Sequence, residues 1–211
     1  MERKKIGLLT ISLGKYDMFI PPLLKSVDKY FMKNKDITFF CFTEKDMPQK
    51  KGRVLVKKIE IIPDEYKPFF PMATLKRYHI FDKYKDILSE MDYLYYCDAD
   101  MLFVNNVGDE IFPDNESELV GTEHPGFYGG RRGTYETNPN STAFVSINEG
   151  KVYFAGGFNG GTSNAFLKMS EIIKNNVDKD LENQLIAVWH DESHINRYFI
   201  DNPPKVLNPS Y

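Results

Sequence analysis

Apolar runs and amphipathic segments alternate along the first half of the chain. The apolar runs, rich in β-branched and aromatic residues, predict buried strands at 6–11, 37–43, 54–59 and 93–97. Two segments between them, 19–31 and 73–90, predict helices, and Pro21 and Pro22 lie near the start of the first, where a helix tolerates proline. The second carries apolar residues at helical spacing, namely Leu75, Tyr78, Phe81, Ile87 and Leu88. This alternation predicts an α/β fold with a mainly parallel central sheet flanked by helices.

The second half of the chain is less regular. Short strands are predicted at 119–122 and 152–155. Between them, residues 126–140 predict a long loop, and long loops in compact domains are commonly functional. Helices are predicted at 163–175, 178–188 and 190–200. Ser163 and Asp178 are suitable N-caps for the first two, and Asp201–Pro204 ends the last.

Length, hydropathy and cysteine content narrow the class of protein. A chain of 211 residues corresponds to one domain. No apolar run approaches the roughly 20 residues of a membrane span. The first five residues, 1–5, lack the apolar stretch of a signal peptide, so we expect a cytoplasmic protein without a membrane anchor. Cys41 and Cys97 each lie in an apolar run, which favours buried free thiols over a disulfide framework.

The net charge of −3 is unevenly distributed along the chain. Residues 1–60 hold 14 Lys and Arg against 7 Asp and Glu, whereas residues 61–211 hold 13 against 23. The acidic part is either a set of solvated faces or a region that recruits cations. The overall balance argues against nucleic acid as the main partner.

Two carboxylates, Asp98 and Asp100, directly follow the predicted strand 93–97. In open α/β sheets, ligands bind at the carboxyl ends of the strands. Carboxylates one residue apart point the same way on extended backbone, so the pair could hold one hard divalent cation and, through it, the phosphates of a nucleotide. The alternative is an acidic turn or a helix N-cap.

A glycine-rich segment, 155–161, precedes the helix predicted at 163–175. Glycines let the backbone approach a ligand closely, and a helix N-terminus favours an anion. The segment lacks both the dinucleotide fingerprint and the lysine of a P-loop. A flexible turn is the alternative interpretation.

The only tryptophan, Trp189, begins a polar stretch that extends to Asn196. His190 and His194 would share a helix face, which raises the possibility of zinc. Glu192 would then lie roughly 200° around the helix from each, away from a metal that both histidines held. The remaining interpretations are a solvated helix start or a catalytic carboxylate beside polar substrate contacts.

A further motif, His124–Tyr128, follows the strand predicted at 119–122. An isolated histidine is more often structural than catalytic. The aromatic rings of Phe127 and Tyr128 would suit the apolar face of a sugar.

Taken in order, these segments resemble glycosyltransferase family 6, which includes the histo-blood-group A and B transferases, α1,3-galactosyltransferase and smaller bacterial relatives. The resemblance covers nearly the whole chain. Its longest motifs are His124–Tyr128 and Trp189–Asn196. The other matching segments are 14–16, 30–32, 42–43, 74–77, 92–94, 98–100, 134–136, 156–158 and 205–209.

The resemblance implies a single GT-A domain over 1–211, with a Rossmann-like nucleotide-sugar-binding half at about 1–104 and an acceptor-binding and catalytic half at about 105–211. It also implies a retaining transfer of GalNAc or Gal from a UDP-sugar to the 3-OH of a galactose-containing oligosaccharide, in α1,3 linkage. Transfer of another UDP-hexose such as UDP-Glc, or carbohydrate binding with little turnover, are the alternatives.

The resemblance assigns donor-side roles to several residues. Asp98 and Asp100 would bind Mn2+, or Mg2+, and the donor diphosphate. The donor itself would be contacted by Tyr16 at the uracil, by Arg77 and Asp191 at the sugar, and by the donor-selecting segment Ala155, Gly156 and Gly157. The small residue at Gly157 leaves room for an N-acetyl group and therefore favours UDP-GalNAc.

The resemblance also assigns residues to the acceptor side of the site. His124, Thr134 and Trp189 would face the acceptor. Glu192, beside the anomeric carbon and the acceptor, would be the nucleophile or the stabiliser of the transition state.

Two departures from the family pattern change the expectation. Many bacterial relatives have asparagine in place of both aspartates and work without metal, whereas this chain has Asp98 and Asp100, so we predict metal dependence. Family members also continue past Asn208-Pro209 into a tail whose basic residues close over the diphosphate. This chain ends at Tyr211, so we expect other cations, such as Arg77, to take that role, unless the tail was removed.

Overall fold

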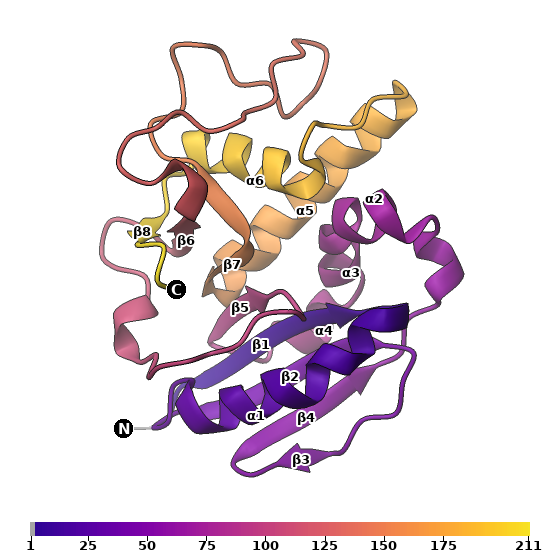
Figure 1. Ribbon diagram of the computed structural model, residues 1–211, viewed down its shortest axis with the longest axis vertical. Helices are drawn as coiled ribbons and strands as arrows, with labels where there is room; N and C mark the ends of the chain where they lie inside the picture. The colour runs from indigo at the N-terminus through magenta and orange to yellow at the C-terminus, as the bar shows by residue number, and fades with distance from the viewer. Residues whose placement is uncertain (1–2) are drawn as a thin grey trace.

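The computed structural model describes residues 3–211 and contains one eight-stranded sheet with helices on both faces (Figure 1). The strands are β1 Lys5–Ser12, β2 Asp36–Thr43, β3 Lys50–Lys51, β4 Val54–Ile59, β5 Tyr93–Cys97, β6 Leu119–Glu123, β7 Phe154–Thr162 and β8 Lys205–Leu207. The α-helices are α1 Ile20–Tyr30, α2 Phe69–Leu75, α3 Arg77–Lys83, α4 Lys85–Leu88, α5 Ser163–Glu182 and α6 His190–Asp201. Short 3-10 helices span Gly14–Phe19, Pro63–Tyr66, Asp109–Ile111 and Pro125–Phe127.

The strand order is β3-β4-β2-β1-β5-β7-β6-β8. Four neighbouring pairs are parallel, and β7 lies antiparallel to both β5 and β6. The predicted α/β architecture with a mainly parallel sheet is therefore confirmed. The five strands predicted before residue 125 are present within one residue at each end, whereas the short strands β3 and β8 were not predicted.

Alternating side chains of the central strands fill a core on each face of the sheet. Ile6 and Leu8 of β1 pack with Leu23 and Val27 of α1, which lies in front of the sheet in Figure 1. Leu9, whose side chain points the other way, packs into the second core. That core also contains residues of α3 and α5, including Tyr78, Phe81, Phe166 and Ile173.

The helix predicted at 73–90 is in fact divided between α2, α3 and α4. Lys76 and Tyr84, at φ −95° and −110°, leave the helical region at the two breaks. In one straight helix, Leu75 and Leu88 would point about 140° apart. The breaks allow both to be buried in the same core, while Ile87, predicted on the apolar face, is 39% exposed.

The glycine-rich segment is the main error of the prediction. Residues 156–161 form neither a turn nor a ligand loop at a helix N-terminus, because they lie inside β7. β7 runs antiparallel to β5 and pairs Phe158 with Cys97 and Thr162 with Tyr93. The N-terminus of α5 is therefore at the opposite end of β5 from Asp98, so it cannot serve an anion at that edge.

Helix α5 also differs from the prediction, because it replaces two predicted helices with one of 20 residues. Its buried side chains recur at helical spacing straight through the predicted break, at Phe166, Met169, Ser170, Ile173, Val177 and Asp180. Its N-cap is Thr162, whose hydroxyl accepts from the N–H of Ala165, rather than Ser163. Asp178 lies within the helix, and α6 begins at His190 as predicted.

Cys41 and Cys97 are buried free thiols, as predicted. Burial raises the pKa of Cys41 to about 12. Across residues 3–211, the helices are too short or too polar to cross a membrane.

Candidate active site

A cleft of about 210 Å³ opens at the carboxyl ends of β1 and β5. Tyr16, Arg77, Asp98 and Asp100, which come from three separate segments of the chain, all line it. The remaining wall includes the apolar side chains of Ile11, Leu13 and Ala73. The half-exposed ring of Tyr16 and the two carboxylates therefore face one space that is open to solvent.

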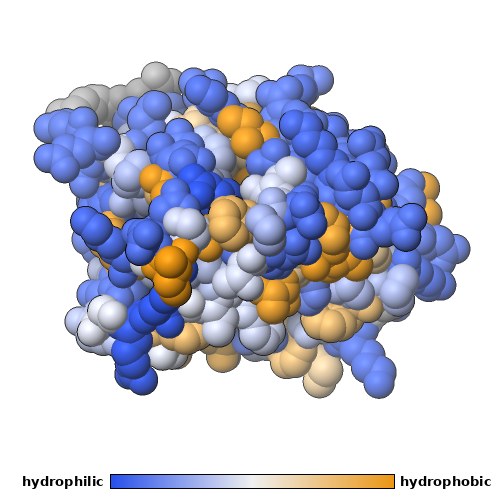
Figure 2. Space-filling view, turned by 90° about the horizontal axis from the view of Figure 1, so that it is seen from above, coloured by the Kyte–Doolittle hydropathy of each residue, from blue (hydrophilic) through white to orange (hydrophobic). Residues whose placement is uncertain are grey.

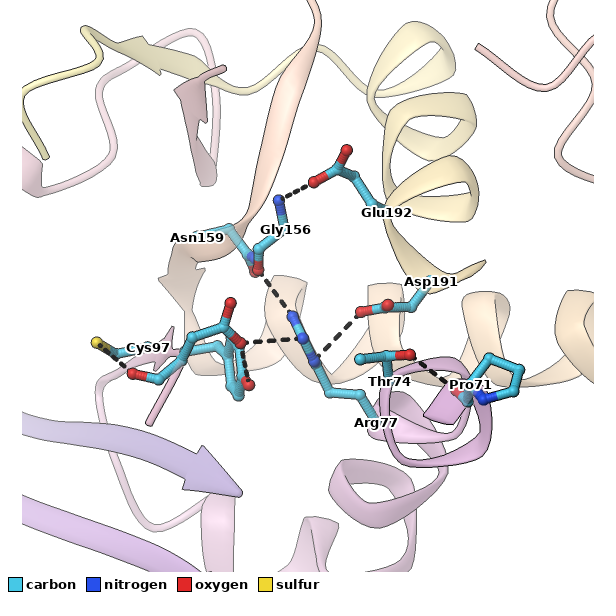
Figure 3. Close-up of polar contacts among 10 residues, drawn as sticks. Pro71, Thr74, Arg77, Cys97, Gly156, Asn159, Asp191 and Glu192 are labelled. Carbon is cyan, nitrogen blue, oxygen red and sulfur yellow. Dashed lines mark hydrogen bonds and ion pairs between the residues drawn. The ribbon is translucent and has the colours of Figure 1, made fainter. Parts of the chain in front are cut away.

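Arg77, the first residue of α3, lies at the centre of the polar contacts drawn in Figure 3 and is only 5% exposed. Its guanidinium donates to the Gly156 carbonyl at 2.7 Å and to Asp98 Oδ1 at 3.0 Å. Its Nε lies 3.2 Å from Asp191 Oδ2. The guanidinium also lies over the ring of Tyr96, 4.0 Å from the centroid. One side chain thus connects β5, β7 and α6.

The positive charge of Arg77 and the negative charge of Asp191 each favour the charged form of the other. Burial alone would lower the pKa of Arg77. The effects of Asp191, Tyr96 and Asp98 outweigh burial and raise the pKa above its ordinary value, so the guanidinium stays charged. Burial raises the pKa of Asp191 to about 7 against the opposing effect of Arg77, and Asp98 and Glu192 add to the rise. Asp191 is therefore a buried acid whose charge depends on Arg77.

Glu192 lies in the first turn of α6, next to Asp191 in the sequence. Its carboxylate accepts from the Gly156 N–H at 2.8 Å and from the Tyr153 hydroxyl at 2.9 Å (Figure 3 shows the first of these bonds). Two donors from β7 and the residue before it hold the carboxylate in place while the side chain remains partly exposed. The side chain is therefore a carboxylate held in a fixed position at the edge of the site.

The segment Ala155, Gly156 and Gly157 lies between these groups, at the start of β7. A Cβ on Gly156 would lie 3.5 Å from Glu192 Oε2, which is ordinary contact. A Cβ on Gly157 would lie 3.0 Å from Asp98 Oδ2 and 3.2 Å from Met101 Sδ, which is tight. A side chain at 157 would therefore press on the first carboxylate of the pair.

Asp98 and Asp100 place two carboxylates at the edge of the cleft. Asp98 Oδ1 accepts from Arg77 and from the Tyr96 hydroxyl at 2.6 Å, while Oδ2 lies beside Gly157. Asp100 is exposed on the cleft. No group of three or more His, Cys, Asp or Glu side chains gathers at metal-binding distance within residues 3–211. The pair therefore fits a cation that takes its other ligands from substrate phosphates and water.

Two of the three residues expected at the acceptor, His124 and Thr134, lie beside Tyr153. The His124 ring packs 5.8 Å from the ring of Tyr153, whose hydroxyl bonds Glu192. Thr134 makes a side-chain hydrogen bond with the same tyrosine. Burial and then Glu192 raise the pKa of Tyr153, whereas the bond with Thr134 lowers it. Trp189 directly precedes α6 and is 49% exposed.

The face of the molecule seen in Figure 2 is mostly hydrophilic, with apolar side chains in separate groups.

His190 and His194 occupy different environments. His190 begins α6 with a φ of +52°, and burial lowers its pKa. His194 is 2% exposed, and its Nε2 lies 3.8 Å from Asp180 Oδ2. Burial lowers the pKa of His194 to about 4 against the opposing effects of Asp180 and Glu136. His194 is thus a neutral interior histidine.

Three residues that shape the site were given no role there from the sequence, namely Tyr96, Tyr153 and Glu136. Tyr96 precedes Asp98 by two residues, so strand alternation could have placed both on one side of the sheet. Tyr153 was included in a predicted strand without a polar role. Glu136 was noted only as part of a matching segment, and nothing in the sequence indicates its partners.

Comparisons with known proteins identify one family of similar sequences. The model described as Glycosyltransferase family 6 matches residues 1–211. The chain is 34% identical over 218 residues to Histo-blood group ABO system transferase 1 of Rattus norvegicus, covering 100% of this chain and 61% of that protein. It is 32% identical over 216 residues to Globoside alpha-1,3-N-acetylgalactosaminyltransferase 1 of Homo sapiens, covering 98% and 60%.

A bacterial relative is more similar in length. The chain is 29% identical over 211 residues to O-antigen biosynthesis glycosyltransferase WbnI of Escherichia coli, covering 98% of this chain and 86% of that protein. The chain spans only about 60% of the rat and human relatives.

Proposed function

Because the chain belongs to glycosyltransferase family 6, we propose that it transfers GalNAc, or Gal, from UDP to the 3-OH of a galactose-type acceptor, forming an α1,3 linkage with retention. The names of the relatives support this proposal, since they include a histo-blood group ABO system transferase and a globoside alpha-1,3-N-acetylgalactosaminyltransferase. The observation that carries it is Arg77, whose buried guanidinium connects Asp98 in the cleft with Asp191 beside Glu192.

On the donor side, the cleft would hold the UDP group. The half-exposed ring of Tyr16 would stack on the uracil, and Asp98 and Asp100 would hold Mn2+ or Mg2+ against the diphosphate. A bound divalent cation supplies positive charge that stabilises the departing UDP. Arg77 adds a fixed positive charge at the same place, and its contacts with Asp98 and Gly156 keep it there before the substrate binds.

Glu192 would act at the anomeric carbon of the sugar. Its carboxylate is held by the Gly156 N–H and the Tyr153 hydroxyl, and both of these donors are uncharged. It would attack this carbon or shield the positive charge that develops as the bond to UDP breaks. Asp191 would accept from hydroxyls of the donor sugar, with its charge maintained by Arg77.

We propose UDP-GalNAc as the preferred donor. Gly157 leaves open the space beside Asp98 and Met101 that a larger residue would fill. His124, Thr134 and Trp189 would contact the acceptor from the far side of Tyr153 and Glu192.

A UDP-release assay tests the proposal. UDP-GalNAc, UDP-Gal and UDP-Glc are each supplied with Mn2+ or with EDTA, and with or without lactose. The expected result is release that is fastest with UDP-GalNAc, that requires the cation, and that the galactoside accelerates above the slow hydrolysis of the donor alone. Lactose binding without UDP release from any donor would instead identify a carbohydrate-binding protein.

A further inference from the structure

Glu136 is a buried carboxylate in the long loop between β6 and β7, and it is 8% exposed. Its Oε2 accepts from the backbone N–H of Val188 at 2.7 Å, and its Oε1 accepts from the N–H of Asn138 at 2.7 Å. Its own carbonyl accepts from the N–H of Val145 at 2.9 Å. One side chain therefore closes the loop on itself and ties it to the turn before α6.

The two segments that Glu136 connects carry residues proposed to face the acceptor. Thr134 is two residues before Glu136 in the loop, and Trp189 directly follows Val188 in the turn. The N–H of Trp189 donates to Ser193 Oγ at 3.0 Å, so the backbone at this point is fixed to α6. A carboxylate that bonds Val188 thus sets where the loop lies relative to the tryptophan.

The rest of the loop is anchored elsewhere. Asp180 of α5 accepts from Ser141 Oγ at 2.5 Å and from the Thr142 N–H at 2.7 Å. That anchor holds the loop beyond residue 140, and the Asp180 carbonyl accepts from the Leu185 N–H at 2.8 Å, three residues short of Val188. At 2.7 Å the buried bond from the Val188 N–H lies at the short end of the range for N–H···O hydrogen bonds, so it is well suited to hold a segment that is otherwise loop.

We propose that Glu136 is a positioning residue for the acceptor, which sets the separation of Thr134 and Trp189 across the acceptor site. The inference rests on the proposed function for the identity of the acceptor. Neither Arg77 nor Asp98 contacts Glu136. The carboxylates of Asp191 and Glu192 are held by Arg77, Gly156 and Tyr153 and not by Glu136, so the donor side keeps its own contacts when this bond is lost. Loss of the bond therefore weakens acceptor binding while donor binding and donor hydrolysis remain.

The test uses Glu136→Gln, with Glu136→Ala as the stronger variant and Glu171→Gln, an exposed site on α5, as the matched control. The glutamine amide keeps one acceptor oxygen, so one of the two backbone N–H groups loses its partner. Two readouts are taken below the thermal transition of each variant. The first compares the acceptor KM with donor hydrolysis without acceptor. The second is acrylamide quenching of Trp189, the only tryptophan in the chain.

The expected result for Glu136→Gln is an acceptor KM raised about tenfold, as for loss of one buried hydrogen bond, with donor hydrolysis within about twofold. Quenching of Trp189 should increase, more so in Glu136→Ala, and Glu171→Gln should match the unmodified chain. An unchanged acceptor KM with unchanged quenching overturns the inference, as does an equal loss of hydrolysis and transfer. If the unmodified chain turns over no UDP-sugar, the proposed function has failed, and the quenching still decides whether Glu136 holds the turn.

Discussion

Replacement of Arg77 by methionine removes the charge at the centre of the site and keeps most of the side-chain volume. Asp191, which is 3% exposed and 3.2 Å from the Arg77 Nε, then becomes a buried carboxylate without its cation. Breaking one side of a buried pair costs about 3–5 kcal/mol in free energy of unfolding. For a domain of this size, that loss lowers Tm by roughly 6–20 °C.

The loss should depend on pH in a defined direction. Burial raises the pKa of Asp191 to about 7, above the value of about 4 in an unfolded chain. The folded state therefore binds more protons between these values, and stability from this group falls as pH rises through that window. Without Arg77 the pKa of Asp191 rises further, so Arg77→Met should lose less stability at pH 5 than at pH 8.

The assay is urea unfolding at both pH values for Arg77→Met, Asp191→Asn and the double variant. Removing the Asp191 charge should restore part of the stability lost in Arg77→Met, so the two changes are not additive. Arg3→Met, which breaks an exposed pair with Asp36, is the control and should cost less than about 1 kcal/mol. A loss in Arg77→Met as small as in that control, with additivity and no pH dependence, would refute the reasoning.

Three further predictions concern turnover. Glu192→Gln should lower transfer at least about 100-fold with little change in donor KM, because it removes charge beside the anomeric carbon; near-normal transfer would exclude the proposed role. Excess EDTA should abolish transfer and added Mn2+ should restore it, and full activity in EDTA would show that Asp98 and Asp100 need no cation. Gly157→Ala should reduce turnover of UDP-GalNAc more than that of UDP-Gal, because its Cβ would lie 3.0 Å from Asp98 Oδ2 and 3.2 Å from Met101 Sδ; an unchanged donor ratio in parallel kinetics would contradict this.

Strands β1, β2 and β5 were predictable because they are buried on both faces. In β2, for example, residues 37–43 are all buried, so an unbroken apolar run is the direct signature of a central parallel strand. The carboxylates after β5 were predictable for the same reason, since the run ends where the sheet edge begins.

The glycine segment was not predictable from local preference. Glycine weakens strands in general, yet β7 needs it, because a Cβ at Gly160 would lie 2.4 Å from the Leu94 carbonyl. That contact comes from β5, more than 60 positions earlier, so the sequence around 160 contains no sign of it. The central position of Arg77 was hidden in the same way, because its partners Gly156 and Asp191 lie far along the chain.

The most direct test of the central claim is the structure of the product. The chain is incubated with UDP-GalNAc, Mn2+ and lactose, and the trisaccharide is analysed by NMR for its linkage and anomeric configuration. The account predicts GalNAc joined through an α linkage to the 3-position of galactose. A β-linked product, a different attachment position, or UDP and free GalNAc alone would contradict it.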